Sequence, residues 1–420
     1  MWCFKNDPAF QNELDWIRDF VREEVVPLDY ILGSQWDIHA PKFKELVRPL
    51  QAKVKAHGLW ACHLGPELGG KGYGQLKLAL MNEQFGISRF GPIIFGVQAP
   101  DSGNSEILSH FGSAEQKQRY LGPLLNNDIV SCFAITEPQG GADPLQVRTK
   151  AVKEGDVWVI NGEKWFSSSA CYAEFYIIMA VTEPDAPPHN RMSLFIVPAN
   201  TQGIEIVRNY GVYGEADKTH GHVSWTNVRV PAGNMLGERG DGFAVTQVRL
   251  GGGRLHHAMR ALAEATSCFD YMCERVNSRF TKGETLASKQ LVQEKIADSW
   301  VELRQFRLLV LETAWLVDQG KSWKELRKHV SAVKATMPKL LHDIASRALY
   351  LHGSLGLSTQ MPFASSVLNS FHLGLADGPT EVHKVVVARQ VLKDYPPTED
   401  MFPDYIRYKQ EARAKALYNK

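Results

Sequence analysis

The chain has 420 residues, of which 44% are hydrophobic, and this is enough for two or three structural units with a large buried core. Its 47 basic and 46 acidic residues leave a formal charge of +1. This small net charge excludes attraction of nucleic acid or an anionic membrane by the charge of the chain as a whole. Neither an uninterrupted run of about 18 apolar residues nor a secretory signal is found, so we expect a cytoplasmic protein with no membrane span.

Apolar residues at three- and four-residue intervals predict an amphipathic helix over residues 12–26. Further helical stretches follow to about residue 125, separated by loops rich in glycine and proline. We therefore predict an N-terminal helical domain over residues 1–128. The glycine-rich loop at residues 65–72 has neither the spacing nor the preceding strand of a dinucleotide fingerprint, which disfavours an NAD-dependent dehydrogenase.

Short runs of β-branched and aromatic residues replace the helical pattern after residue 128. The clearest runs are residues 157–160, 175–178, 193–197 and 222–225. They predict a compact, β-barrel-like middle domain over residues 129–240. Asn161 and Gly162 lie between two apolar runs, and because an Asn-Gly pair supplies the positive φ angles of a type I′ turn, we predict a β-hairpin there.

Helical periodicity returns after residue 240, and its clearest stripe is expected to line the inner face of one long bundle helix. This stripe consists of Val292, Ile296, Trp300, Leu303, Phe306, Val310, Ala314 and Val317. We predict a C-terminal four-helix bundle over residues 241–397 and a charged tail over residues 398–420. Helices followed by strands and again by helices indicate an α+β fold and argue against a Rossmann domain.

The six cysteines are scattered without a C-x-x-C pair in a chain too large to need disulfides, so we expect reduced, buried and structural thiols. They are Cys3, Cys62, Cys132, Cys171, Cys268 and Cys273. No pairing of cysteine, histidine and carboxylate has the spacing of metal ligands, and we predict no metal site. His256 and His257 follow a glycine-rich segment, and we interpret them as packed or solvated helix residues.

Asp377 and Gly378 place a carboxylate beside a glycine late in the helical half of the chain. On these two residues alone a turn is the favoured interpretation, because Asp-Gly is a common turn dipeptide. Two other segments are compatible with ligand binding. Residues 132–143 contain a Thr-Glu-Pro turn and a glycine pair that can expose backbone N–H groups. Arg254 follows three glycines and is either solvated or able to hold a phosphate or a carboxylate with two hydrogen bonds.

Taken in the order in which they follow along the chain, these segments resemble the acyl-CoA dehydrogenase superfamily. The resemblance is closest to acyl-CoA dehydrogenase family members ten and eleven, without their kinase-like domains. The resemblance extends from the N-terminal helices to about Leu392. It implies FAD-dependent α,β-dehydrogenation of an acyl-CoA thioester to a trans-2-enoyl-CoA, with Asp377 as the base that removes the α-proton. It also implies a homodimer or homotetramer and an electron-transfer flavoprotein that reoxidises the FAD.

The resemblance also implies which residues bind the cofactor and the substrate. FAD would be contacted by Phe133, Ala134, Ile135, Thr136, Phe166, Ser167, Ser168, Thr380 and Glu381. Segments that reach the FAD of a neighbouring subunit would contribute Arg279, Gln290, Tyr350, Gly353 and Ser354. The substrate would be contacted by Ala142, Arg254, Gly378 and Arg389.

The chain departs from the family pattern at Ala142, Lys282 and Tyr350, where Ser, Phe and Gln are usual. Asp377 is one methylene shorter than the usual Glu, and Ala376 replaces a residue that is often bulky, which suggests a wider acyl pocket. Two alternatives stay open. One is a flavin oxidase on the same fold, of the acyl-CoA or the nitroalkane oxidase type, and the other is a non-catalytic acyl-CoA-binding relative.

Overall fold

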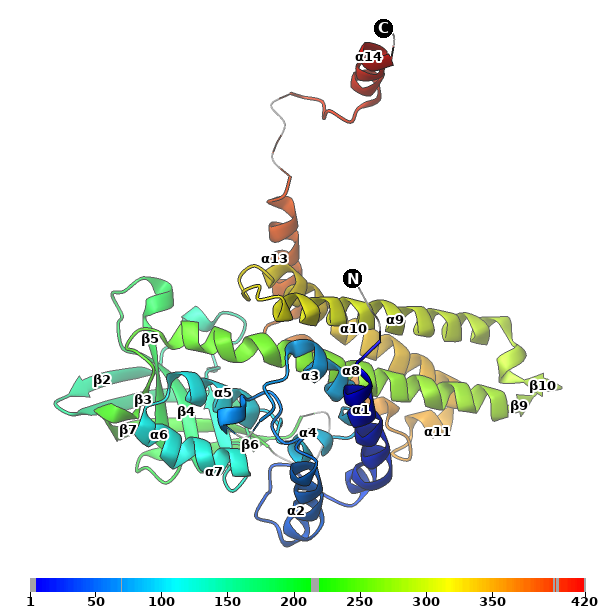
Figure 1. The fold of residues 1–420 in the computed structure, drawn as a ribbon. Helices are drawn as coiled ribbons and strands as arrows, with labels where there is room; N and C mark the ends of the chain where they lie inside the picture. Colours follow the sequence, from blue (N-terminus) through cyan, green and yellow to red (C-terminus); the bar gives the residue numbers. More distant parts are fainter. Residues whose placement is uncertain (1–4, 69, 213–218, 396, 398–399, 419–420) are drawn as a thin grey trace.

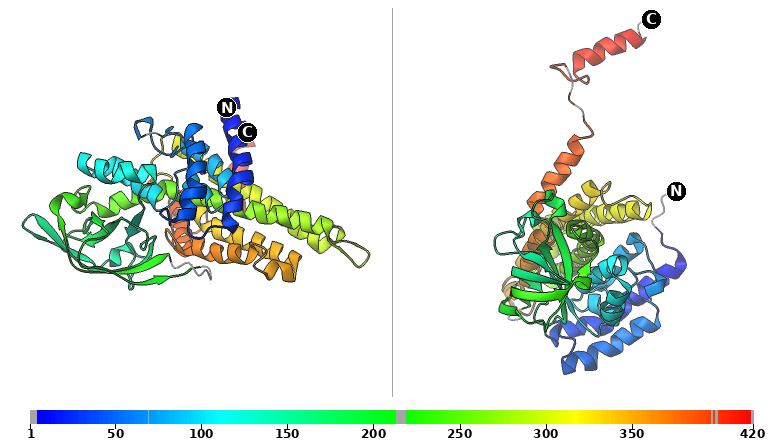
Figure 2. Two further views of the ribbon diagram at one scale, coloured as in Figure 1. Left: turned by 90° about the horizontal axis from the view of Figure 1, so that it is seen from below. Right: turned by 90° about the vertical axis from the view of Figure 1, so that its left-hand side faces the viewer.

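The computed structural model describes residues 5–68, 70–212, 219–395, 397 and 400–418. A group of helices is followed by a sheet and then by a bundle of long helices, as Figure 1 shows. The sheet and the bundle lie side by side, and the N-terminal helices cover one side of their junction (Figures 1 and 2). The predicted α+β class is therefore confirmed.

The first helix begins where its sequence supplies a cap. The Asp7 side chain accepts a hydrogen bond of 2.9 Å from the Phe10 N–H, and proline occupies the first helical position. The helix therefore begins at Pro8, before the predicted residue 12, and it ends at Phe20, where a π-helical segment (Val21–Val25) continues the chain. The predicted apolar stripe is buried from Leu14 to Val25 across both segments. The helices before the sheet are α1 (Pro8–Phe20), α2 (Pro41–Ala56), α3 (Gln75–Phe85), α4 (Gly91–Ile94), α5 (Asp101–Phe111), α6 (Ala114–Gln116) and α7 (Gly122–Asn126).

The sheet has the order β6-β7-β3-β2-β4-β5-β8, and β1 pairs in parallel with β4. Its strands are β1 (Ser131–Ala134), β2 (Lys150–Glu154), β3 (Val157–Ser168), β4 (Phe175–Val181), β5 (Met192–Pro198), β6 (Ile204–Tyr210), β7 (His220–Pro231) and β8 (Met235–Leu236). All four predicted runs lie in these strands. Successive side chains of a strand point to opposite faces, so Tyr176 and Ile178 belong to one apolar core and Phe175 and Ile177 to another.

The predicted hairpin at Asn161 and Gly162 is wrong, because both residues lie inside β3. The register between β3 and β7 shifts between Ile160 and Gly162, which marks a β-bulge. A Cβ atom on Gly162 would lie 2.4 Å from the Thr149 Oγ1 atom, so the absence of a side chain at Gly162 allows the backbone to lie close to Thr149. The chain reverses instead at Gly155, whose φ of +61° suits a turn.

The C-terminal bundle packs α8, α9, α10 and α12 around one apolar core. The elements after the sheet are α8 (Gly242–Ser278), β9 (Phe280–Thr281), β10 (Glu284–Thr285), α9 (Gln290–Asp318), α10 (Arg327–His352), α11 (Ser354–Leu357), α12 (Phe363–Leu375), α13 (Thr380–Leu392) and α14 (Arg407–Tyr418). The predicted inner stripe of α9 is buried or half-buried except at Trp300, which is 52% exposed and lies under the Arg304 guanidinium. That part of the prediction is wrong.

Three further expectations concern the cysteines, membrane-spanning helices and the charged tail. Cys62, Cys132 and Cys268 are buried thiols as predicted, but Cys273 is only half-buried, and Cys171 is exposed because it lies in the turn that follows β3. Cys3 lies outside the described residues. None of the helices in the described ranges is both long and apolar enough to cross a membrane. The tail helix α14 has no buried residue and stands apart from the rest in Figure 1 and in the right-hand view of Figure 2.

Candidate active site

A cavity of about 2350 Å³ lies where the sheet, the bundle and the N-terminal helices meet. Its wall includes the loop after β1, the end of β3, one face of α8, the end of α12 and the loop between α12 and α13. It brings together Thr136, Phe166, Ser168, Arg254 and Asp377, which are far apart in the sequence. The segments that carry these five residues therefore converge on one space.

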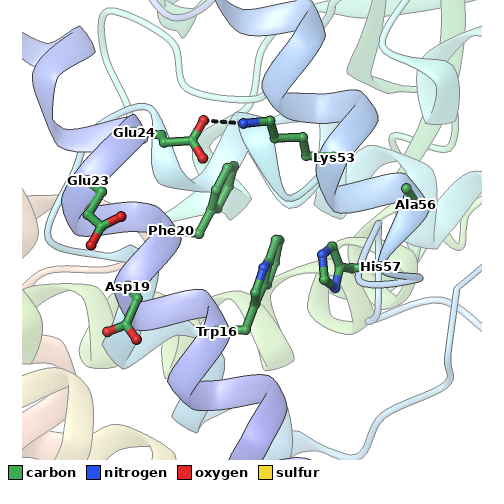
Figure 3. A pocket seen from close by; sticks show the side chains of 8 residues that line it. All are labelled: Trp16, Asp19, Phe20, Glu23, Glu24, Lys53, Ala56 and His57. Atoms are coloured by element: carbon green, nitrogen blue, oxygen red, sulfur yellow. Dashed lines mark hydrogen bonds and ion pairs between the residues drawn. The ribbon is translucent and has the colours of Figure 1, made fainter.

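A second, smaller pocket of about 430 Å³ lies on the surface between α1 and α2. Figure 3 shows its aromatic side chains, in which the Trp16 ring stacks against Phe20 and His57 with centroid distances of 4.8 Å and 3.8 Å. Lys53 pairs with Glu24 at its rim. Because these rings and charges already contact one another, we place the candidate active site in the larger cavity.

Asp377 lies in a turn whose backbone is unusual. Its φ is +56°, and Gly378 follows with a φ of +104°, so two successive residues adopt left-handed conformations. The Asp377 carbonyl oxygen faces Arg254 Nη2 at 3.2 Å and His383 Nε2 at 3.3 Å. Arg254 thus donates to the backbone of this turn rather than to the carboxylate. The Asp377 side chain remains 28% exposed and faces the cavity.

The surroundings of Asp377 favour its ionised form. Burial alone raises the pKa of the carboxyl, but the positive charge of His257 in its protonated, acidic form and of Arg249, Arg254 and Lys334 outweighs that effect and lowers the pKa below its usual value. Burial lowers the pKa of His257 to about 4, so at neutral pH the imidazole is neutral and the lysine and the two arginines supply the positive charge. A carboxylate in this setting is ready to accept a proton.

Sequence reasoning missed three of these neighbours. His257 was interpreted as packed or solvated, yet it lines the cavity, with its Nε2 atom 3.9 Å from Asp377 Oδ2. It lies three residues after Arg254 and therefore on a similar face of α8, which was a usable signal. Arg249 lies with its guanidinium carbon 4.0 Å from the centre of the Phe133 ring. Lys334 comes from α10, and nothing in its local sequence distinguishes it from other helix lysines.

The Thr-Glu-Pro loop is anchored by a buried ion pair. Glu137 and Lys164 are almost fully buried and lie 2.8 Å apart. The Glu137 carboxylate also accepts hydrogen bonds from the backbone N–H groups of Arg148 and Thr149 at 2.6 Å and 3.0 Å. Lys164 Nζ donates to the Ile135 carbonyl oxygen at 2.9 Å. These contacts tie Thr136, on the cavity wall, to the part of β3 that carries Phe166.

Phe166 has a φ of +47°, which is strained for a residue with a side chain, and lies at a bulge in β3. Its ring is 47% exposed, lines the cavity and stacks against Tyr210 with a centroid distance of 5.4 Å. Thr136 and Ser168 line the same wall. An aromatic face flanked by hydroxyl groups fits a flat conjugated ring such as that of a flavin.

The predicted cofactor residues thus fall into four groups. Those on the cavity wall are Phe133, Ile135, Thr136, Phe166 and Ser168. Ala134 and Ser167 are buried behind that wall, and the Ser167 hydroxyl has no hydrogen-bond partner in the described part of the chain. Thr380 and Glu381 open α13 outside the wall, where the Thr380 hydroxyl donates to the Gly374 carbonyl oxygen at 3.3 Å.

The fourth group lies far from Asp377. Arg279 and Gln290 flank the β9–β10 hairpin, and Tyr350, Gly353 and Ser354 lie at the junction of α10 and α11. Figure 1 shows both segments at the end of the bundle opposite the sheet. All five are exposed or half-buried, with Tyr350 78% exposed. Of the predicted substrate residues, Ala142, Arg254 and Gly378 line the cavity, whereas Arg389 is exposed on α13.

Comparison with known proteins follows the same division of the chain. Models of the N-terminal, middle and C-terminal domains of acyl-CoA dehydrogenases match residues 10–128, 132–228 and 240–392. FadE2 of Mycobacterium tuberculosis, which carries the name of an acyl-CoA dehydrogenase, is 40% identical over 83% of this chain and 86% of its own length. Acyl-CoA dehydrogenase family member 11 of Rattus norvegicus is 34% identical, and the match spans 91% of this chain but half of that relative's length.

Solved structures give the same result. A Mycobacterium abscessus protein that carries the name acyl-CoA dehydrogenase is 38% identical and superposes with a TM-score of 0.87, over 94% of this chain and all of that one. The butyryl-CoA dehydrogenase of Megasphaera elsdenii, at 24% identity and a TM-score of 0.80 over 93% of this chain and all of that one, shares the fold. The chain therefore belongs to the acyl-CoA dehydrogenase family, whose members are FAD-dependent oxidoreductases that act on acyl-CoA thioesters.

Proposed function

We propose that this chain catalyses α,β-dehydrogenation of an acyl-CoA thioester to a trans-2-enoyl-CoA, with Asp377 as the base. The observation that carries the proposal is the convergence of an ionised, cavity-facing carboxylate with Thr136, Phe166 and Ser168. The carboxylate and the aromatic wall face one space, in which an acyl chain and a flat cofactor ring can lie against each other. FAD, when bound, supplies the acceptor for the β-hydride.

Residues of the chain itself would supply the base, hold it in position and bind the cofactor and the substrate. An α-proton of a thioester is too weakly acidic to leave in water at neutral pH, so a positioned base and polarisation of the carbonyl are both required. Asp377 takes the proton, while Arg254 and His383 hold the turn that carries it through their contacts with its backbone oxygen. Thr136, Phe166 and Ser168 would hold the flavin ring, and Ala142 and Gly378 would border the thioester.

We assign the exposed residues to binding events outside the cavity. Arg389 would meet the phosphates of CoA. Arg279, Gln290, Tyr350, Gly353 and Ser354 would contact the FAD of a second copy, because they lie at the far end of the bundle. A homodimer or homotetramer follows from this assignment. The size of the holoprotein by light scattering, and loss of FAD on dilution of an Arg279→Ala variant, would test it.

The experiment for the main proposal is anaerobic titration of the purified FAD-loaded protein with a panel of acyl-CoA thioesters, followed by flavin absorbance. The wild-type protein should bleach with its substrates, and Asp377→Asn should not. Asp394→Asn is the matched control, since Asp394 is exposed on the surface and pairs with Lys328. Flavin reduction that persists in Asp377→Asn would remove the base role from this residue. Reoxidation by an electron-transfer flavoprotein in a coupled assay would identify the acceptor that we propose.

An oxidase on the same fold is the second candidate, and the use of aspartate as the base is the observation that favours it. An oxidase would consume oxygen in air without any other acceptor. A dehydrogenase would stay reduced until an electron-transfer flavoprotein is added. A protein that cannot be loaded with FAD would instead support a non-catalytic acyl-CoA-binding relative.

A further inference from the structure

Arg249 places a positive charge beside the part of the cavity wall that leads into the Thr-Glu-Pro loop. Its side chain lines the cavity from the first half of α8, and its guanidinium carbon lies 4.0 Å from the centre of the Phe133 ring. This distance is that of a close cation–π contact. Phe133 belongs to β1, which ends just before Thr136, and both residues line the cavity. The cation therefore lies beside the wall to which we assign the flavin ring.

The guanidinium is held in this position by uncharged groups. Its Nε atom donates to Asn104 Oδ1 at 2.9 Å, and its Nη2 atom donates to the Pro100 carbonyl oxygen at 3.4 Å. Asn104 is buried, and its Nδ2 atom donates in turn to Ser131 Oγ at 2.8 Å. Within the described ranges of the chain, Arg249 takes part in no ion pair. Its position is therefore fixed without a counter-charge in contact with it.

The carboxyl groups near Arg249 compensate its charge only in part. Burial lowers the pKa of the guanidinium, and the charges of Asp377, Glu106 and Asp101 act against that effect. Burial also raises the pKa of Glu106 and of Asp101 to about 7, so both groups are partly protonated at neutral pH. The Asp377 carboxylate interacts with Lys334 as well. Negative charge that forms beside Arg249 would therefore be stabilised by this cation.

Negative charge forms at two places when an acyl thioester is dehydrogenated. One is the thioester, whose carbonyl oxygen gains charge as the α-proton leaves. The other is the ring of FAD, when bound, because a hydride brings an electron pair to it. The contact of Arg249 with Phe133 favours the flavin. The proposed function puts the flavin ring beside Thr136 and the thioester beside Ala142 and Gly378.

We propose that Arg249 raises the reduction potential of the bound flavin, because its fixed positive charge beside Phe133 stabilises the electron-rich form of the ring. This inference rests on the proposed function and adds a residue to the same site. Arg249 then sets how readily the flavin accepts electrons, whereas removal of the α-proton stays with Asp377. A residue that only anchored α8 to Asn104 would affect stability and leave the potential of the flavin unchanged.

Sulfite tests this role without any acyl-CoA. Its sulfur atom adds to an oxidised flavin ring with its lone pair, so the ring gains negative charge and loses the absorbance of the oxidised form. Sulfite is titrated into the purified, FAD-loaded protein, and the flavin absorbance gives its Kd. We expect this Kd to be about 10-fold to 10²-fold higher in Arg249→Met than in wild type, because one nearby unit charge is lost. Arg249→Lys keeps the charge and should retain most of the affinity.

The reduction potential gives a second measurement. Reductive titration against a reference dye should place the two-electron potential of Arg249→Met about 30–60 mV below that of wild type, since each factor of ten corresponds to about 30 mV. Arg249→Gln is a second uncharged variant, whose amide can still donate to Asn104. It should show the same losses as Arg249→Met, which separates the effect of the charge from the anchoring of the side chain.

Arg304→Met is the matched control, because the Arg304 guanidinium carbon also lies over an aromatic ring, 5.5 Å from the centre of Trp300 on α9. It should change neither quantity. Equal sulfite affinity and equal potential in FAD-loaded wild type and Arg249→Met would overturn the inference and leave the proposed function standing. A shift of both quantities without bleaching by any acyl-CoA would support the inference and refute the dehydrogenation. A wild-type protein that binds no FAD would refute both.

Discussion

His257 Nε2 lies 3.9 Å from Asp377 Oδ2, across the junction of α8 with the turn that follows α12. This distance is too long for a hydrogen bond, but contacts between catalytic groups commonly tighten when a substrate is bound. Burial lowers the pKa of His257 to about 4, so the imidazole approaches the carboxylate as a neutral group. It restricts the carboxylate position and adds no charge at neutral pH.

His257→Leu should lower the rate constant for flavin reduction by about 10-fold to 10²-fold with little change in KM, because a displaced base loses its alignment with the α-carbon. His257→Gln should recover part of the rate, since its amide N–H can again approach the carboxylate. Stopped-flow flavin reduction with a saturating acyl-CoA measures both variants. An unchanged rate in His257→Leu would show that the imidazole only fills space.

The lowered pKa of Lys334 predicts that the rate of flavin reduction depends on pH. Burial lowers the pKa of Lys334 from 10.5 to about 8, and Asp377 opposes part of that shift. When the ammonium loses its proton near pH 8, one positive charge beside Asp377 disappears and the carboxylate becomes more basic. The rate constant for flavin reduction should therefore rise between about pH 7 and 9. Lys334→Arg should remove this rise, because arginine stays charged over the whole range.

The same shift predicts a trend in stability. The folded state of Lys334 holds its proton less tightly than the unfolded state does, so the unfolded chain binds more protons between about pH 8 and 10.5. The contribution of this group to the free energy of unfolding should rise with pH across that window. Denaturant unfolding of wild type and Lys334→Arg at several pH values would check it, and a difference that does not vary with pH would contradict the pKa assignment.

The sequence predicted the order of elements well, because amphipathic and alternating patterns report directly on burial. It failed where burial depends on a distant partner. The spacing of Trp300 fits the buried stripe of α9, yet the residue is 52% exposed. Gly162 was wrongly predicted to lie in a hairpin turn, because the close approach of Thr149, which makes its position a bulge, is a tertiary contact.

The candidate site, too, could be predicted from the sequence only in part. Asp377, Thr136 and Phe166 lie in segments with recognisable motifs, and the fold brings them into one cavity. The charges that set the pKa of Asp377 come from helices without a motif, since Arg249 and Lys334 are ordinary helix residues until α8 and α10 pack beside the turn. A single sequence can therefore point to a candidate base more readily than to its electrostatic surroundings.

The buried pair of Glu137 and Lys164 should be sensitive to the loss of either partner. Lys164→Met leaves an uncompensated buried carboxylate and should lower the free energy of unfolding by about 3–5 kcal/mol. The double variant Glu137→Gln with Lys164→Met should lose less, because no unpaired charge remains. Chemical denaturation measures all three proteins. The exposed pair of Arg229 and Glu154 is the control, for which removal of one partner should change stability by less than about 1 kcal/mol.

Gly378 should be required for the geometry of the Asp377 turn. Its φ of +104° is accessible to glycine but strained for alanine, and a Cβ atom there would lie 2.8 Å from His383 Nε2. Gly378→Ala should therefore displace the turn and lower the rate of flavin reduction by about 10²-fold. Gly253→Ala is the matched control, because Gly253 lies inside α8 with open space around it and alanine should stabilise the helix by up to about 1 kcal/mol. Equal rates in the two variants would show that the turn does not depend on this glycine.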